Sequence, residues 1–370
     1  MAKITGNKGE WSELYVLLYL LANGKLYAAD ENLNRLENIF FPVLKIYREY
    51  KDLNKKVEYE ISHNTPMVAE ESPNAGEVLV YLNDDFVCAL PQKEILKAKQ
   101  ELYVDIKNGP GAAFPIERVE HIMEKLCCYK IKAPSSNKSD IEMQIHDVHT
   151  GYSPVCGFSI KSDLGNSPTL LNASEATNFV FKVKGLTRQQ AEQINGINTK
   201  HKIVDKMAAI DSYGAKLEFA GMYNDIFQSN LLMIDSFMQN ILSYIMEYSY
   251  QTGKMNCLEI LLAIEEKNPL KYPRTGMYMY KFKKFLCAIA LGLMPSKKWD
   301  GYEEANGGYI IVKSSGDVVA YHIYNRNSFE DYLLANTKFE RGSTSRHKYA
   351  TIYEKGGELF INLNMQIRFI

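Results

Sequence analysis

Two short segments in which polar and apolar residues alternate, 140–147 and 155–162, constrain this chain most strongly. Successive side chains of a β-strand point to opposite faces, so each segment is predicted to be a strand with one apolar and one polar face. The apolar positions are Ile141, Met143, Ile145, Phe158 and Ile160. The polar positions are Asp140, Glu142, Gln144, Ser159 and Lys161. Thr150-Gly151 between the segments predicts a turn, and hence an antiparallel hairpin.

The pairing register of this hairpin decides which polar side chains meet. A slip by one residue would set apolar side chains against polar ones, so the apolar faces must align. The register that aligns Ile141 with Ile160 also places Asp140 opposite Lys161 and Glu142 opposite Ser159. Directly opposed side chains have Cβ atoms about 5 Å apart. We therefore expect two carboxylates, a hydroxyl and an ammonium to cluster on the polar face.

Such a cluster suits metal-assisted hydrolysis of a phosphodiester. Mg²⁺ prefers oxygen ligands, commonly one or two carboxylates together with water and phosphate oxygens. The cation acidifies water and neutralises charge on the phosphate, and a neighbouring lysine can orient that water. The hairpin thus predicts Asp140, Lys161, Ser159 and Glu142 as catalytic, with Mg²⁺ as cofactor. On the hairpin alone, a solvated polar face with a surface ion pair is the commoner outcome.

Asp147 is a second aspartate in the same hairpin. It lies next to the expected turn, roughly 23 Å from Asp140 along an extended strand. Aspartate is a favoured turn residue because its side chain can bond to the nearby backbone. We therefore predict a turn role for Asp147 and not a catalytic one.

The rest of the chain predicts a mixture of helices and strands in an α+β or α/β fold, with a central mixed sheet flanked by helices. Helices are expected over 8–22, 92–103, 116–128, 231–248 and 276–293, and 187–250 is mainly helical. Strands are expected within 56–92, in a hairpin over 309–324 with Ser315-Gly316-Asp317 at its turn, and over 358–370. No repeat or linker is seen, so the parts are expected to pack as one body. The expected regions are 1–185 for the core, 186–300 for a mainly helical part and 301–370 for a β-rich end.

Composition excludes several classes of protein. The formal net charge is -1, so any nucleic-acid surface must be a local basic face. The 6 cysteines form no CxxC pair, and no histidine set has metal spacing, so a zinc site is not expected. No run of about 18 apolar residues and no signal-peptide pattern occur, which predicts a cytoplasmic protein without membrane spans.

Six stretches carry a resemblance to a known family. They are NKGEWSELY (7–15), GKLYAAD (24–30), DIEMQIHD (140–147), GFSIKSDLGNSPTLLNASEATNF (157–179), ERGSTSRHKYA (340–350) and LNMQIRF (363–369). Together they resemble the HpaII-type family of type II restriction endonucleases, within the PD-(D/E)XK nuclease superfamily. The block at 157–179 is the most specific, and the stretches span nearly the whole chain.

The resemblance implies a nuclease core of the PD-(D/E)XK type with helical and C-terminal β-rich DNA-binding additions. It also implies Mg²⁺-dependent cutting of double-stranded DNA at a short palindromic site, which is CCGG for the family's namesake. Asp140 would hold the metal and Lys161 would position the attacking water. Ser159 departs from the acid that the (D/E)XK pattern expects, and Glu142 could supply the missing oxygen.

Glu13 is a further candidate metal ligand, on the first helix. Its context, Lys8-Gly9 followed by Glu13, is similar to that of a helical glutamate found in many nucleases of the superfamily. The alternative is that acidic residues simply suit the first turn of a helix, where they complement its dipole.

Contacts to DNA are expected from two regions. The polar stretch after Lys161 leads into a predicted helix whose N-terminus could bind phosphate, and 341–348 is the densest basic and hydroxyl cluster. The candidate DNA-binding residues are Ser162, Asn172, Ser174, Arg341, Ser343, Ser345, Arg346, His347, Lys348 and Arg368. An ordinary capped loop and a solvated loop are the respective alternatives.

The predicted partners follow from this function. Cleavage of both strands of a symmetric site favours a homodimer, although a monomer stays open. A cognate DNA methyltransferase is expected as genetic partner. The competing functions are a structure-specific or repair nuclease of the same fold, a catalytically degenerate DNA-binding module, and a protein-binding scaffold.

Overall fold

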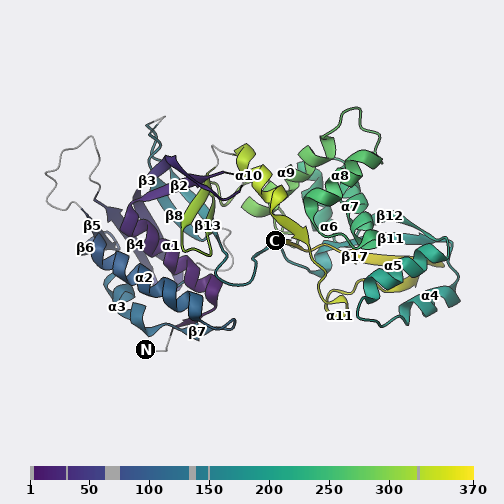
Figure 1. The fold of residues 1–370 in the computed structure, drawn as a ribbon, viewed down its shortest axis with the longest axis horizontal. Coiled ribbons are helices and arrows are strands. Elements are labelled where there is room, and N and C mark those ends of the chain that lie inside the picture. Colours follow the sequence, from purple (N-terminus) through teal and green to yellow (C-terminus); the bar gives the residue numbers. More distant parts are fainter. Residues whose placement is uncertain (1–3, 31, 63–75, 133–138, 149–150, 323–325) are drawn as a thin grey trace. The chain divides into compact units, whose positions relative to one another are not determined.

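The chain folds into two compact units (Figure 1). In this computed structural model the described residues are 4–30, 32–62, 76–132, 139–148, 151–322 and 326–370. Unit 1 comprises Met1–Pro168 and Glu304–Phe329, and unit 2 comprises Thr169–Glu303 and Glu330–Ile370. Helices and strands occur in both units, which confirms a mixed α and β fold.

Unit 1 is built on a nine-stranded mixed sheet. In spatial order its strands are β2 (Lys25–Ala29), β14 (Val318–His322), β13 (Gly308–Val312), β9 (Val155–Ser162), β8 (Ile141–Ile145), β3 (Arg35–Tyr50), β4 (Lys55–Ile61), β5 (Glu77–Leu82) and β6 (Asp85–Pro91). The pairs β9–β13 and β14–β2 are parallel, and the other pairs are antiparallel. Because β2 also pairs with the first half of the long β3, hydrogen bonding runs in a closed circuit through six of these strands.

Three helices accompany this sheet: α1 (Lys8–Asn23), α2 (Gln92–Asn108) and α3 (Glu120–Lys125). The Asn7 side chain accepts the Glu10 N–H to cap α1, and Gly24 ends it with φ 62°, a left-handed conformation that glycine adopts without strain. Residues Leu14–Leu21 are all buried, because α2 packs on α1 (Figure 1) while the sheet supplies the rest of the core. A helix that is apolar all round is stable only when covered on several sides. The short strands β1 (Thr5–Gly6) and β7 (Phe114–Pro115) pair beside it.

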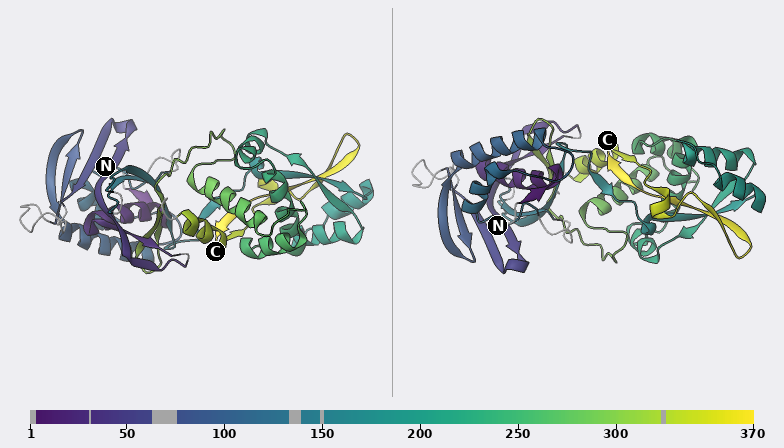
Figure 2. Two further views of the ribbon diagram at one scale, coloured as in Figure 1. Left: turned by 90° about the horizontal axis from the view of Figure 1, so that it is seen from above. Right: turned by 90° about the horizontal axis from the view of Figure 1, so that it is seen from below.

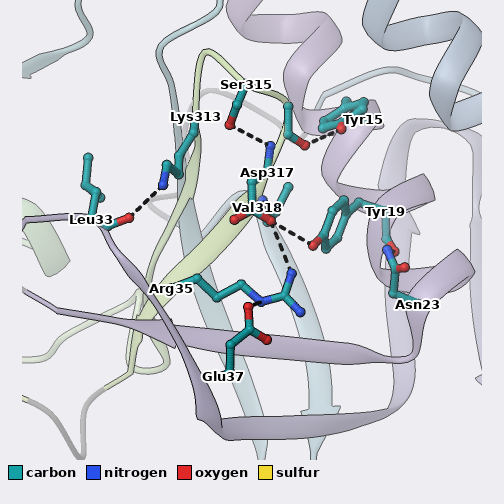
Figure 3. Close-up of polar contacts among 11 residues, drawn as sticks. Tyr15, Tyr19, Asn23, Leu33, Arg35, Glu37, Lys313, Ser315, Asp317 and Val318 are labelled. Atoms are coloured by element: carbon teal, nitrogen blue, oxygen red, sulfur yellow. Dashed lines mark hydrogen bonds and ion pairs between the residues drawn. The ribbon is translucent and has the colours of Figure 1, made fainter.

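A polar cluster fastens the turn of the β13–β14 hairpin to neighbouring elements (Figure 3). Asp317 accepts from the Tyr19 hydroxyl at 3.2 Å and pairs with Arg35 at 3.5 Å. Lys313 donates to the Leu33 carbonyl at 2.9 Å. The hairpin and its predicted turn are thus confirmed, and one aspartate ties the turn to both α1 and β3.

Unit 2 contains two further sheets and most of the helices. One sheet has the order β12 (Lys216–Met222), β11 (Asn178–Lys184), β17 (Glu358–Asn364), β16 (Ile352–Lys355), and the other the order β10 (Thr169–Leu171), β18 (Ile367–Phe369), β15 (Thr337–Phe339). In Figure 2 the yellow β16–β17 ribbon runs beside the teal strands of this unit. The helices are α4 (Arg188–Asn195), α5 (Lys202–Ser212), α6 (Asp225–Ile234), α7 (Met238–Thr252), α8 (Cys257–Lys267), α9 (Met277–Leu291), α10 (Arg326–Ala335, which begins in unit 1) and α11 (Thr344–His347).

Two expectations for this region are wrong. The single helix over 231–248 is divided into α6 and α7, because Asp235 takes an extended conformation and its carboxylate accepts the Phe237 N–H. Aspartate competes for nearby backbone donors in this way and so interrupts helices. The strands β11 and β12 also stand where helix was expected. They pair with each other, and β11 pairs with the distant β17, and local periodicity does not reveal such partners.

The unit boundaries differ from the predicted regions. The expected break near 185 lies instead at Pro168, and residues 304–329 belong to unit 1 and not to a C-terminal region. The reason is the parallel pairing of β13 with β9, which draws the distant β13–β14 hairpin into the first sheet. None of the helices described is long and apolar enough to cross a membrane. Parts of the expected strands and turns at 63–75, 149–150 and 323–324 lie outside the described residues.

His322, at the end of β14, is buried among aromatic rings in unit 1. Its ring centroid lies 4.7 Å from that of Phe41 and 5.9 Å from that of Phe158. Burial lowers the pKa of His322 to about 4, although the negative charge of Asp147 acts in the opposite direction. The folded state therefore holds this imidazole neutral.

We expect the free energy of unfolding to fall as the pH drops from 6.5 to about 4, because the unfolded chain then binds a proton at His322 that the folded chain does not. This pKa difference corresponds to roughly 3 kcal/mol at the acid end. A His322→Phe protein should lack this part of the pH dependence, whereas His121→Phe, an exposed site on α3, should keep it. Urea unfolding at about pH 7 and about pH 4.5 measures both. An unchanged pH dependence in His322→Phe would contradict the assignment.

Candidate active site

The predicted hairpin is present as β8 and β9, but its register differs from the prediction by two residues. Ile141 lies opposite Phe158, and Glu142 lies opposite Gly157. The predicted oppositions of Asp140 with Lys161 and of Glu142 with Ser159 are therefore wrong. A slip of two residues keeps every side chain on its face, so the apolar pattern fits both registers equally.

The Asp140 carboxylate lies directly before β8. Beyond Phe158, β9 has no further partner in β8 and pairs only with β13. Its Oδ2 accepts the backbone N–H of Ile160 at 2.7 Å and the Ser159 hydroxyl at 3.1 Å. The backbone N–H of Asp140 donates to the Phe158 carbonyl at 2.8 Å. The Asp140 carboxylate thus accepts the Ile160 N–H in place of a backbone carbonyl of β8, and this bond fixes the orientation of the carboxylate. Within the described part of the chain, Oδ1 accepts no hydrogen bond.

Lys161 lies on the same face of β9 as Ser159, one pleat or about 7 Å further along the strand. On its other side β9 pairs with β13, where Tyr309 lies opposite Ser159. The Lys161 ammonium stands 5.4 Å from the centroid of the Tyr309 ring. No carboxylate among the described residues lies within ion-pair distance of it, so its charge is available to a ligand.

Asp140 and Glu142 line a pocket of about 860 Å³ in unit 1. The other lining residues come mainly from β3, β4 and the segment before β8, and are Tyr47, Arg48, Glu49, Tyr50, Lys51, Asp52, Lys56, Val57, Glu58, Asp84, Lys130, Lys132, Ser139, Ile141 and Val155. Lys161 is not among them. The site is therefore a pocket that reaches Asp140 from the β3 side, with Lys161 on the adjoining part of the sheet face.

Most charges in the pocket wall have a partner. Lys130 pairs with Asp52 at 2.7 Å, and Lys132 pairs with Glu10 of α1. By contrast, Asp140 and Glu142 have no cationic partner within the described residues. Two unneutralised carboxylates facing one pocket favour a cation as ligand.

Glu13 lies near this site without lining the pocket. The hydroxyl of Ser12 donates to that of Ser162 at 2.7 Å, which joins the start of α1 to the residue after Lys161. Hydrogen bonding to Glu10 raises the pKa of Lys132, and the charge of Glu13 adds to this in the same direction. The charge of Glu13 therefore acts on Lys132, a cation of the pocket wall.

The donor set fits a divalent cation that prefers oxygen ligands. Asp140 and Glu142 offer carboxylate oxygens, and Mg²⁺ typically takes one or two of these while water and phosphate fill its remaining positions. Among the described residues no group of three or more histidine, cysteine, aspartate or glutamate side chains is preformed to hold a metal. A closed protein cage of the zinc type is not what these residues build.

The candidate DNA-binding residues are distributed over both units. Ser162 is buried in unit 1 and accepts from Leu164 N as well as from Ser12, which assigns it to joining β9 with α1. The helix expected after Ser174 is wrong, because only a 3₁₀ turn, Glu175–Thr177, follows it before β11 begins. Asn172 is exposed and Ser174 is partly exposed.

The basic segment 341–348 lies in unit 2, around the short helix α11. Ser345, Arg346 and Lys348 are exposed, Ser343 caps the helix, and the His347 carbonyl accepts from Asn178. Three cations of the set are partly engaged: Lys348 pairs with Glu175 at 2.9 Å, Arg341 donates to the Ser249 carbonyl at 2.9 Å, and Arg368 pairs with Glu340 at 3.1 Å. The exposed members are thus placed to reach a ligand, while Arg341 and Arg368 also support the fold.

Sequence reasoning missed β3 and the cations that share the pocket with Asp140. Arg48 lies on β3, and Lys130 and Lys132 lie before β8. The run of aromatic and branched residues over 39–47 was a strand signal of the ordinary kind. No local signal marks Lys130 or Lys132, because only the pairing of β8 with β3 brings them to the site.

The comparisons with known proteins agree with this chemistry. A family model described as HpaII restriction endonuclease matches residues 7–369. A curated relative, the type II restriction enzyme HpaII of Haemophilus parainfluenzae, is 41% identical over 374 residues, covering 99% of each chain. No solved structure matches this chain.

The chain therefore belongs to a class of restriction endonucleases. More particularly, it is a member of the HpaII restriction endonuclease family.

Proposed function

We propose that this protein is a type II restriction endonuclease that hydrolyses phosphodiester bonds of double-stranded DNA at a short palindromic site. The observation that carries the proposal is the juxtaposition of Asp140 with Ser159, one pleat from Lys161, beside a pocket containing Glu142. Identity of 41% to the HpaII enzyme over 99% of the chain supports CCGG as the site.

The same residues support a PD-(D/E)XK-like core. An aspartate at the start of one strand touches the serine that begins the Ser159-Ile160-Lys161 triplet on the next strand. Helix α1, which carries Glu13, is joined to the end of that strand through Ser12. The hydrogen bond between Asp140 and Ser159 and the attachment of α1 to Ser162 support this reading of the motif, with Glu13 as its helical glutamate.

In the proposed mechanism the carboxylates of Asp140 and Glu142 would hold a Mg²⁺ ion. When bound, the ion neutralises charge on the phosphate and acidifies water. The Lys161 ammonium donates to the phosphate or the attacking water and stabilises the negative charge of the transition state. The N–H of Ile160 and the hydroxyl of Ser159 both donate to Oδ2 and so fix the orientation of the Asp140 carboxylate.

Ser159 acts in this scheme by orienting Asp140 and not as a metal ligand. Its hydroxyl donates to Oδ2 of Asp140, so the oxygen that an acid would offer at this position is replaced by a hydrogen bond. Glu142, which is exposed and faces the same pocket, supplies the second carboxylate. Glu13 is the alternative ligand from α1.

The proposal extends to partners. The exposed residues of 341–348, together with Asn172 and Ser174, are proposed to contact DNA from unit 2. A homodimer would match the two-fold symmetry of a palindromic site. A cytosine methyltransferase that protects the same sequence is the expected genetic partner.

The decisive experiment is a digest of two plasmids that differ only in the presence of one CCGG site. With Mg²⁺ we expect cleavage of only that plasmid which carries the site, with 5′-phosphate at the cut ends. Chelation of the metal by EDTA should abolish this cleavage. Cleavage at branched or damaged DNA without sequence preference would instead favour a repair nuclease. Binding of the duplex without cleavage in Mg²⁺ or Mn²⁺ would make the protein a degenerate binding module.

A further inference from the structure

A second pocket, of about 570 Å³, lies wholly within unit 2. Helix α5 contributes Lys202 and Lys206, and the segment around α11 contributes Thr344, Ser345 and Lys348. No aspartate or glutamate is among the described residues that line it. A chain with a formal net charge of -1 thus concentrates cations and hydroxyl groups in one hollow.

Lys206 is the central group of this cationic pocket. It is 8% exposed, and its ammonium donates to the Ala350 carbonyl at 3.0 Å, which uses one of its three protons. Burial lowers the pKa of Lys206, and the nearby charge of Lys202 lowers it further. Two ammonium groups are therefore held close together, which is unfavourable unless an anion joins them.

The neighbouring carboxylates do not neutralise this pair. Glu175 pairs with Lys348 at 2.9 Å at the rim. No carboxylate of the described residues lies within ion-pair distance of Lys202 or Lys206. The ammonium groups of Lys202 and Lys206 are thus available to an anionic ligand.

Two of the three amide side chains that line the pocket, those of Asn195 and Asn362, are already occupied. Asn195 uses both its oxygen and its nitrogen on the backbone of Ile352, each at 2.8 Å. Asn362 accepts from the Tyr353 hydroxyl at 3.0 Å and donates to the Lys348 carbonyl at 3.3 Å. A nucleobase edge needs both donors and acceptors. Apart from the exposed Asn198 amide, the polar side chains left in the pocket carry ammonium and hydroxyl groups, which can donate to the oxygens of an anion. An anion with several oxygens matches them best.

We propose that Lys202 and Lys206 form a binding site for a backbone phosphate of duplex DNA. The inference rests on the proposed function, which makes DNA the substrate, and it adds α5 to the DNA-contacting surface. The site is continuous with the exposed basic segment, since Thr344, Ser345 and Lys348 belong to both. A phosphate contact carries no sequence information, so α5 positions the duplex and does not read it.

The test compares Lys202→Gln and Lys206→Met with the control Lys216→Gln, an exposed lysine of β12 outside the pocket. Binding of a CCGG duplex is measured by fluorescence anisotropy with Ca²⁺ in place of Mg²⁺, over a range of salt concentrations. We expect each pocket variant to weaken binding about 10-fold and to reduce the slope of log affinity against log salt by about 1. The control should bind as the wild type does.

Wild-type affinity and salt slope in both pocket variants would overturn the proposal. Since Lys206→Met could disturb folding, thermal melts accompany the assay, and Lys202→Gln, at a half-buried position, keeps the test decisive. Inorganic phosphate that stabilises the wild type but not Lys202→Gln, with unchanged DNA binding, would assign the pocket to a free anion and also overturn it. If the wild-type protein neither binds nor cuts duplex DNA, the proposed function itself is wrong. This outcome is distinct from a wrong pocket assignment, in which the wild type binds DNA and the pocket variants bind it equally well.

Discussion

An Asp140→Asn protein is expected to cut its DNA site roughly 1,000-fold more slowly than the wild type at the same Mg²⁺ concentration. Asparagine keeps the shape of the side chain, and its carbonyl oxygen can still accept from Ile160 N and the Ser159 hydroxyl. What is lost is the negative charge, and with it the oxygen that holds the cation. The measurement is the initial rate of plasmid linearisation, with duplex binding followed separately in Ca²⁺.

Two further carboxylates of the same pocket serve as comparisons. Asp84→Asn removes an exposed carboxylate from the pocket rim and should leave the rate within about threefold of the wild type. Glu142→Gln should lower the rate, and part of that loss should be recovered at higher Mg²⁺, as expected for a weakened ligand. An Asp140→Asn enzyme that cuts at the wild-type rate would remove the basis of the proposed mechanism. A Glu142→Gln enzyme with an unchanged requirement for Mg²⁺ would transfer the second ligand position to Glu13.

The hairpin shows how far periodicity alone can lead. Alternation over 140–147 and 155–162 predicted both strands and their faces correctly, because each apolar side chain had to reach the core. It could not choose between registers two residues apart, which bury the same faces. The choice depends on groups outside the pattern: the Asp140 carboxylate bonds to Ile160 N, and Asn306 bonds to Gly157 N.

The missing parts of the prediction are those that depend on distant segments. The parallel pairing of β14 with β2 and the transfer of residues 304–329 to unit 1 arise from contacts between segments that are far apart in the sequence. No periodic pattern within either segment encodes which partner it will meet. The helix α1 was predictable because its cap, its apolar residues and Gly24 all lie within one continuous stretch. Of the charged residues near the site, only those carried by the hairpin itself, such as Asp140 and Lys161, could be predicted.

Replacing Lys161 tests the other half of the site, because its loss should affect the reaction and leave the cation in place. We expect Lys161→Met to slow cleavage by roughly 100- to 1,000-fold, since methionine preserves the packing of the side-chain stem but removes the ammonium. Binding of the duplex in Ca²⁺ should weaken by no more than about 10-fold, the effect of one phosphate contact.

The dependence on Mg²⁺ then separates Lys161 from the carboxylates. Lys161 stands beside Tyr309 with no carboxylate partner among the described residues, so its charge can act on the phosphate or the water and not on the ligands of the metal. The slow rate of Lys161→Met should therefore saturate at the same Mg²⁺ concentration as the wild type, while Glu142→Gln needs more. A Lys161→Met protein restored by excess Mg²⁺ would place this lysine in support of the carboxylates. A rate equal to that of the wild type would exclude it from the reaction, and Lys132, one of the cations that share the pocket with Asp140, would become the candidate.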